Sequence, residues 1–118
     1  MNEQKLKGAL GLATRARQVS TGMDACRILI RSGTCGLMLL DGGTGPNTRR
    51  KAEDLCRRSE TPVWVVPAGL IEEATGKSNM VLGIRNGSFS ERIAGLLQEA
   101  GSESGGRQDE QEPSKQFE

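Results

Sequence analysis

Three short apolar runs constrain the fold of this chain more than any other feature: "GLMLL" at 36–40, "PVWVV" at 62–66 and "MVLGI" at 80–84. A continuous apolar run of this length, bounded by turn residues, is typical of a strand buried inside a sheet. Between these runs, apolar residues recur at helical spacing. Alternating helices and strands predict an α/β protein, and we expect a three-layer α/β/α sandwich with a mostly parallel, partly mixed central sheet.

Helical spacing predicts five helices, over residues 3–14, 22–32, from 46 onward, within 69–76 and over 88–100. Ser20 or Thr21 is expected to cap the second helix, and Gly33 to end it. Pro46 suits the first turn of the third helix, and Gly76 the end of the fourth. Ser88 and Glu91 have the spacing of a capping box. A short strand near residues 17–19 is expected to join one edge of the sheet.

The charge distribution divides the chain into two parts. Residues 101–118 hold five acids, two bases and one large apolar residue, Phe117. Burial of this little apolar surface cannot offset the loss of chain entropy on folding. We therefore predict a disordered acidic tail. Residues 1–100 carry fourteen bases and ten acids and form one predicted domain. A mildly basic domain is compatible with nucleic acid as a partner.

Composition argues against several classes of protein. No apolar run approaches the roughly 20 residues of a membrane span, and the N-terminus lacks the apolar segment of a signal peptide, so a cytoplasmic protein without membrane contact is expected. The chain has no histidine, which removes the usual base for a nucleophilic serine or cysteine. Its three cysteines have no C-x-x-C spacing, so we expect buried thiols and no metal site. Asp41 ends a predicted strand and is read as a turn former. We expect neither catalysis nor a cofactor.

Basic residues gather in three places: Arg15 and Arg17, then Arg27 and Arg31, then Arg49, Arg50 and Lys51. Each group alone is typical of a solvated face. Together they favour a polyanionic partner. The turns at 20–22 and 77–79 are expected at the same end of the sandwich, where a polar, basic groove would form. The scarcity of aromatic residues argues against a base-stacking platform.

A glycine-rich loop, "DGGTGPNTRRK" at 41–51, offers an alternative site. It joins a predicted strand to a helix start, where backbone N–H groups and the helix dipole can hold a phosphate. It matches neither the Walker pattern nor G-x-G-x-x-G, and a plain strand-to-helix loop is the commoner interpretation. The alternative function is therefore a small phosphate- or cofactor-binding domain; a third is a protein-interaction module. The candidate anion-loop residues are Gly42, Gly43, Gly45, Thr48 and Arg49.

From about Lys7 to Leu97 the chain resembles the L-seven-Ae/L-thirty-e ribosomal-protein superfamily, and within it the small bacterial YlxQ-like branch. The segments that carry the resemblance are "LGLATRARQVSTGMDA", "IRSGTCGLMLLDGGTGPNTRRK", "PVWVV" and "IEEATGKSNMVLGI". The resemblance implies an α/β/α sandwich that binds structured, kink-turn-like RNA at the start of its second helix.

By this resemblance the RNA contacts map to residues 22–25 and to the turn at 77–79. Two positions depart from the family pattern: Ala25 lacks a hydrogen-bonding side chain, and Ile28 stands where a lysine is frequent. General RNA binding therefore carries over better than kink-turn specificity. The hypothesis is a non-catalytic protein of the translation or ribosome system, monomeric when free, whose partner is structured RNA, with ribosomal RNA among the candidates. The candidate RNA-binding residues are Arg15, Arg17, Thr21, Gly22, Met23, Asp24, Ala25, Arg27, Ile28, Arg31, Lys77, Ser78 and Asn79.

Overall fold

The computed structural model describes residues 2–104, and side chains up to residue 99. Nine elements follow one another in the order α1 (Glu3–Arg15), β1 (Val19–Thr21), α2 (Met23–Arg31), β2 (Cys35–Asp41), α3 (Pro46–Ser59), β3 (Val63–Val66), α4 (Leu70–Thr75), β4 (Val81–Arg85) and α5 (Ser88–Ser104). The expected tail boundary at residue 101 falls inside the last turn of α5. The rest of the predicted acidic tail, 105–118, lies outside the described residues.

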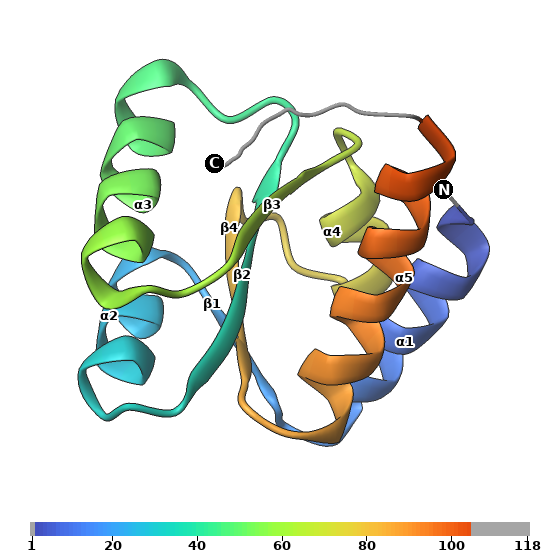
Figure 1. Ribbon diagram of the computed structural model, residues 1–118, viewed down its shortest axis with the longest axis horizontal. Coiled ribbons are helices and arrows are strands. Elements are labelled where there is room, and N and C mark those ends of the chain that lie inside the picture. Colours follow the sequence, from blue (N-terminus) through green and yellow to red (C-terminus); the bar gives the residue numbers. More distant parts are fainter. Residues whose placement is uncertain (1, 105–118) are drawn as a thin grey trace.

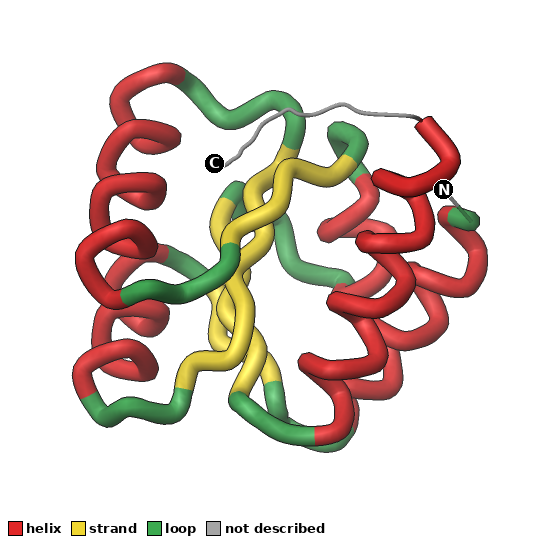
Figure 2. The backbone as a smooth tube through the Cα atoms, viewed as in Figure 1, coloured by secondary structure: helices red, strands yellow, loops and turns green. Residues whose placement is uncertain are grey.

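The elements form three layers, as expected for an α/β/α sandwich. Figure 1 shows α2 and α3 on one face of the sheet and α1, α4 and α5 on the other. Figure 2 shows the strands, in yellow, enclosed between these two helical layers. The four strands lie in the order β1-β4-β2-β3, with β1 and β3 at the edges. The predicted fold class is confirmed.

The expectation that the sheet is mostly parallel was wrong. Only β2 and β3 are parallel, whereas β4 runs antiparallel to both β1 and β2. The connection between β3 and β4 explains this. Its helix, α4, has six residues and spans about 9 Å, less than the roughly 17 Å of the five-residue β4. The chain therefore does not return to the opposite end of the sheet, and β4 starts at the end where β3 stops.

The core lies on both sides of β2. Leu37 and Leu39 point into a cluster shared with α1, α4 and α5, while Met38 and Leu40 point into a cluster shared with α2 and α3. All four side chains are fully buried. Burial on both faces explains why this strand reads as a continuous apolar run instead of an alternating one.

Helix ends confirm some predicted caps and correct others. Pro46 occupies the first turn of α3, and the helix-ending glycines Gly33 and Gly76 have φ of +74° and +76°. The predicted serine and threonine cap of α2 was wrong, because both residues belong to β1 and the N-cap is Gly22.

The predicted capping box of α5 was also wrong. The N–H of Glu91 donates to the carbonyl of Gly87 at 3.0 Å, so Gly87, not Ser88, is the N-cap and Ser88 is the first residue of the helix. Ser90 then takes the capping role, since its Oγ accepts the Gly87 N–H at 3.0 Å. The small strand β1 begins at Val19 instead of residue 17, because Arg17 ends α1 with φ 60°. No helix among the described residues is long and apolar enough to cross a bilayer.

Candidate nucleic-acid interface

The start of α2 presents backbone donors without a side-chain cap. Gly22 is the N-cap, with φ 92° and no side chain to accept the first N–H groups of the helix. The first helical bond runs from the Cys26 N–H to the Gly22 carbonyl at 3.1 Å. The N–H groups of residues 23–25 therefore have no partner within the helix. Together with the helix dipole they form a donor set suited to a phosphate or to acceptor atoms of a base.

The loop before β4 lies directly beside this helix start. The Gly22 N–H donates to the Val81 carbonyl at 2.9 Å. A Cβ atom added to Gly22 would lie 3.7 Å from Oδ1 of Asn79. This confirms that the two turns predicted to carry the RNA contacts share one end of the sandwich. The 3.7 Å distance is an ordinary van der Waals contact, so it is the positive φ that favours glycine at position 22.

The glycine loop after β2 reaches the same end. The Asp41 N–H donates to the Met80 carbonyl at 2.8 Å, and Thr44 Oγ1 donates to the Asp41 carbonyl at 2.6 Å and lies 3.4 Å from the Met80 carbonyl. The two sites that the sequence offered as alternatives are therefore neighbours. We call this end the helix-start surface; it consists of residues 22–25, 77–80 and 42–45.

Asp41 occupies the glycine loop as a turn former, as predicted. Its Oδ2 accepts the Gly43 N–H at 2.7 Å, and its Oδ1 accepts the Gly69 N–H at 2.9 Å. The carboxylate is 8% exposed and ties the loop after β2 to the loop before α4. Since the carboxylate already takes the Gly43 donor and carries negative charge, the loop is not prepared for a small anion.

Ion pairs restrain two of the candidate arginines. The Arg27 Nη1 lies 3.1 Å from Oδ1 of Asp24, within α2. The Arg49 Nε lies 3.1 Å from Oε2 of Glu53, which turns this predicted anion-loop residue back along α3. Exposed pairs of this kind are worth at most about 1 kcal/mol, so a polyanion can displace them. The exposed ammonium of Lys77 has no carboxylate within 4.0 Å among residues 2–99.

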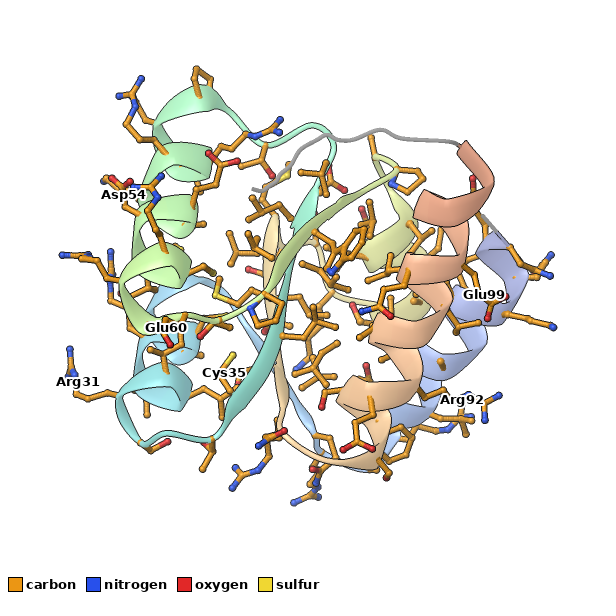
Figure 3. All side chains as sticks on the ribbon, in the orientation of Figure 1. Arg31, Cys35, Asp54, Glu60, Arg92 and Glu99 are labelled. Atoms are coloured by element: carbon orange, nitrogen blue, oxygen red, sulfur yellow. The ribbon has the colours of Figure 1, made fainter. Side chains whose placement is uncertain are left out.

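Three predicted arginines do not lie at the helix-start surface. Arg15 and Arg17 precede β1 and lie at the opposite end of the sheet, since this three-residue strand separates them from Gly22 by about 10 Å. Arg31 is in the last turn of α2 and points away from the sheet, as Figure 3 shows. Sequence proximity to Gly22 suggested one cluster, but an extended strand carries the chain away from it.

The exposed surface of α2 includes Ile28, whose side chain is 65% exposed. Of the apolar stretch 28–30, Leu29 is buried and Ile30 is partly buried. Ile28 thus lies on the outer side of the helix, one turn after Asp24. Its side chain is therefore not part of the core.

The thiols beneath α2 and α3 are not reactive groups. Burial raises the pKa of Cys26 and of Cys56 to about 12, with nearby cysteines adding to the effect. Burial also raises the pKa of the half-buried Cys35. Thiols that hold their protons at neutral pH are poor nucleophiles and poor metal ligands. No group of metal-ligating side chains occurs among the described residues.

Sequence reasoning missed Met80 and Thr44 at the helix-start surface. Met80 is 49% exposed, although it opens the apolar run that becomes β4. Thr44 links the glycine loop to Met80 through its hydroxyl. The signal for Met80 was its position directly after the predicted contact turn. No signal in the sequence connects residue 44 to residue 80, because their contact depends on the strand order.

No family model matches the chain. Among sequences, it is 31% identical to the RNA-binding protein YlxQ of Bacillus subtilis over 90 residues, which cover 75% of this chain and 90% of that protein. It is 26% identical to the RNA-binding protein YlxQ of Enterococcus faecium over 98 residues, covering 82% and 95%.

Two solved structures share the fold. A protein of unknown function from Bacillus halodurans superposes with a TM-score of 0.75 at 33% identity, covering 80% of this chain and 97% of that one. The 15.5-kD RNA-binding protein of Giardia lamblia superposes with a TM-score of 0.66 at 12% identity, covering 81% and 87%, a likeness of fold alone. With 31% identity extending over nine-tenths of the Bacillus subtilis protein, this chain belongs to the YlxQ family.

Proposed function

We propose that this protein is a non-catalytic RNA-binding protein that recognises structured RNA through its helix-start surface. The observation that carries the proposal is the contact between Gly22 and the loop before β4, with 2.9 Å from the Gly22 nitrogen to the Val81 carbonyl oxygen. This contact sets the open donors of α2 beside the loop before β4, and a Cβ atom added to Gly22 would lie 3.7 Å from Oδ1 of Asn79. The names of the YlxQ relatives support RNA as the partner.

The chemistry of the surface fits a folded RNA better than a small anion. Uncapped N–H groups and the ammonium of Lys77 suit phosphate oxygens, while the Asn79 amide offers a donor and an acceptor for a base edge. Gly22 allows a nucleotide to approach the backbone closely. The glycine loop has less support as a separate phosphate or cofactor site, because Asp41 already binds the Gly43 N–H.

The finer proposal is a kink-turn-like RNA of the translation or ribosome system, bound in the cytoplasm by a monomer. It rests on the resemblance to the ribosomal-protein superfamily. The resemblance implies a hydrogen-bonding side chain at position 25 and a lysine at position 28, where this chain has Ala25 and Ile28, so we expect a weaker preference for kink-turn RNA over plain duplex than the family pattern implies.

A binding titration tests the proposal with three RNAs: a kink-turn RNA, a plain duplex and a single strand. We expect the kink-turn RNA to bind most tightly, with a log–log salt slope of roughly −0.9 for each duplex phosphate neutralised. Lys77→Ala should weaken binding and flatten the slope by about one such contribution. Asn79→Ala should weaken binding with little change in slope.

Arg58→Ala serves as the matched control. Arg58 is exposed near the end of α3, about 18 Å along the helix from Pro46, which directly follows the helix-start surface. Its removal therefore lowers the net charge of the protein without changing that surface. Equal losses for Lys77→Ala and Arg58→Ala would show that binding is non-specific. Absence of binding to all three RNAs would contradict the proposed function itself.

A further inference from the structure

Four arginines gather at the end of the sandwich opposite the helix-start surface. Here α1 ends, β1 begins, β4 ends and α5 begins. The Arg85 N–H donates to the Gln18 carbonyl at 2.8 Å, which brings Arg85 beside the segment that contains Arg17. Arg15 is in the last turn of α1, and Arg92 is in the second turn of α5, beside the lower part of α1 in Figure 3. We call residues 15, 17, 85 and 92 the arginine surface.

Arg17 occupies a backbone position that glycine would fill without strain. Its φ is 60°, and the end of α1 is closed by bonds from the Gln18 N–H to the Ala13 carbonyl at 2.9 Å and from the Arg17 N–H to the Thr14 carbonyl at 3.0 Å. The end of α2 has the same two bonds, and there the corresponding residue is Gly33, with φ +74°. A left-handed backbone is costly for a residue with a Cβ. Glu60 at the end of α3 has the same conformation, with φ 56°, so this type of helix end accepts exposed charged residues of either sign in this fold.

The charges of the arginine surface are not compensated. Among residues 2–99, ion pairs engage Lys7, Arg27, Arg49 and Arg57, but none of the four arginines here has a carboxylate within 4.0 Å. The acid nearest to any of the four along the chain is Glu91, which directly precedes Arg92 in the first turn of α5. The dipole of α1 accounts for Arg15 in its last turn, yet Arg85 and Arg92 flank the positive start of α5.

A polar edge connects the two ends of the molecule. The edge strand β1 runs from the arginine surface to Gly22, and it carries Ser20 and Thr21. Residues 19–21 of β1 pair with residues 82–84 of the neighbouring strand β4, so about 10 Å of strand separates the two ends. A ligand that contacts both ends must therefore extend at least about 10 Å along this edge.

We infer that the arginine surface holds the phosphate backbone of a second segment of the same RNA, an arm that extends beyond the part bound at the helix-start surface. The inference rests on the proposed RNA-binding function. The four exposed guanidinium groups, none within 4.0 Å of a carboxylate among residues 2–99, supply the charge complementarity. Guanidinium groups suit phosphate oxygens because of their planar set of donors.

Two RNAs with the same kink-turn motif test the inference, one limited to the motif and the other with one arm extended by a helical turn. We expect Arg17→Gly and Arg85→Gln each to weaken binding of the long RNA about threefold to tenfold, and to flatten its salt slope by roughly 0.7 to 0.9. Binding of the short RNA should not change. Arg58→Gln, on α3 across the sheet, is the control and should change neither.

Arg17→Gly separates binding from folding, because glycine relieves the backbone strain at position 17. The variant should melt no lower than the wild type while it binds the long RNA more weakly. Wild-type affinity of both variants for the long RNA would overturn the second surface and leave the proposed function intact. Equal losses on the short RNA would also overturn it, since the arginines would then belong to the first site. Failure of the wild type to bind either RNA would overturn both.

Discussion

At the scale of single residues, Ile28 is the exposed apolar side chain that bears most directly on the helix-start surface. It is 65% exposed, one turn after Asp24 on α2. Beside a polyanion an isoleucine contributes no charge, while the fold gains little from a side chain that solvent already surrounds.

Ile28→Lys should therefore leave the melting temperature nearly unchanged and tighten binding of kink-turn RNA by about 1 kcal/mol, roughly fivefold. A thermal melt and one titration check this. Ile28→Gln is the matched control, because it removes the apolar side chain without adding charge, and it should not tighten binding. A clear loss of folding, or an affinity equal to that of the glutamine variant, would contradict the placement of RNA along this side of α2.

At the scale of elements, the start of α5 depends on one buried serine. The Oγ of Ser90 accepts the Gly87 N–H at 3.0 Å and donates to the Gly87 carbonyl at 2.9 Å, and the residue is 4% exposed. A Cβ atom added to Gly36 would lie 2.7 Å from this oxygen, so β2 packs closely against the cap.

We expect Ser90→Ala to destabilise the protein by about 1 kcal/mol, the usual cost of a lost cap, whereas Ser88→Ala should have little effect. Urea unfolding of the two variants measures the difference. A larger loss for Ser88→Ala than for Ser90→Ala would show that the helix starts with the capping box that the sequence suggested.

The contact of α2 and α3 with the sheet contains two buried thiols, Cys26 and Cys56, and these predict a pH dependence of stability. Their pKa in the fold is about 12, against an ordinary value of 9.0. A raised pKa means that the folded state keeps protons that the unfolded state releases, so stability is complete below pH 9 and falls as the pH rises toward 12.

Two such thiols should remove about 2–3 kcal/mol of unfolding free energy between pH 8 and pH 10. Urea unfolding in the presence of a reductant measures this loss, and the absence of tyrosine leaves no phenol to titrate in this range. The Cys26→Ala, Cys56→Ala double variant should be less stable at every pH but should lose most of the decline between pH 8 and pH 10. The same decline in this variant would assign it to other groups.

At the scale of the whole molecule, the two ends of the sheet differ in how their charge is presented. The helix-start surface combines open backbone donors with the exposed ammonium of Lys77. The arginine surface presents its positive charge through side chains alone. An RNA that uses both surfaces would contact both ends of the sheet, which one helix start cannot do.

The acidic segment 105–118 carries a net charge of −2, from four acids and two bases. We propose that it is dispensable for folding, so a chain ending at residue 104 should melt within a few degrees of the full chain. Removing the charge should also tighten RNA binding by no more than about twofold at physiological salt, because screening weakens repulsion beyond about 8 Å. A large fall in melting temperature would show that the segment packs against the domain.

Much of this protein could be predicted from local sequence patterns. Helix and strand positions follow from the spacing of apolar residues and from residues that start or end helices, such as Pro46, Gly33 and Gly76. These signals depend only on neighbours within one or two helical turns. The turn-forming role of Asp41 and the burial of Cys26 and Cys56 were also predicted correctly, whereas Cys35 is only partly buried. The bond from the Gly69 N–H to Asp41, across 28 residues of the chain, was not predicted.

Tertiary structure alone decided the direction of β4, the phase of α2 and the separation of Arg17 from Gly22. Each depends on contacts between residues far apart in the chain. Because α4 is short, β4 runs antiparallel to β2. Because Leu29 and Cys26 pack on the sheet, Ile28 faces solvent. Local patterns act over a few residues and cannot rank such alternatives. The sequence was enough to predict which helix start and which arginines are candidates for binding. Strand pairing decided at which end of the sheet each of them lies.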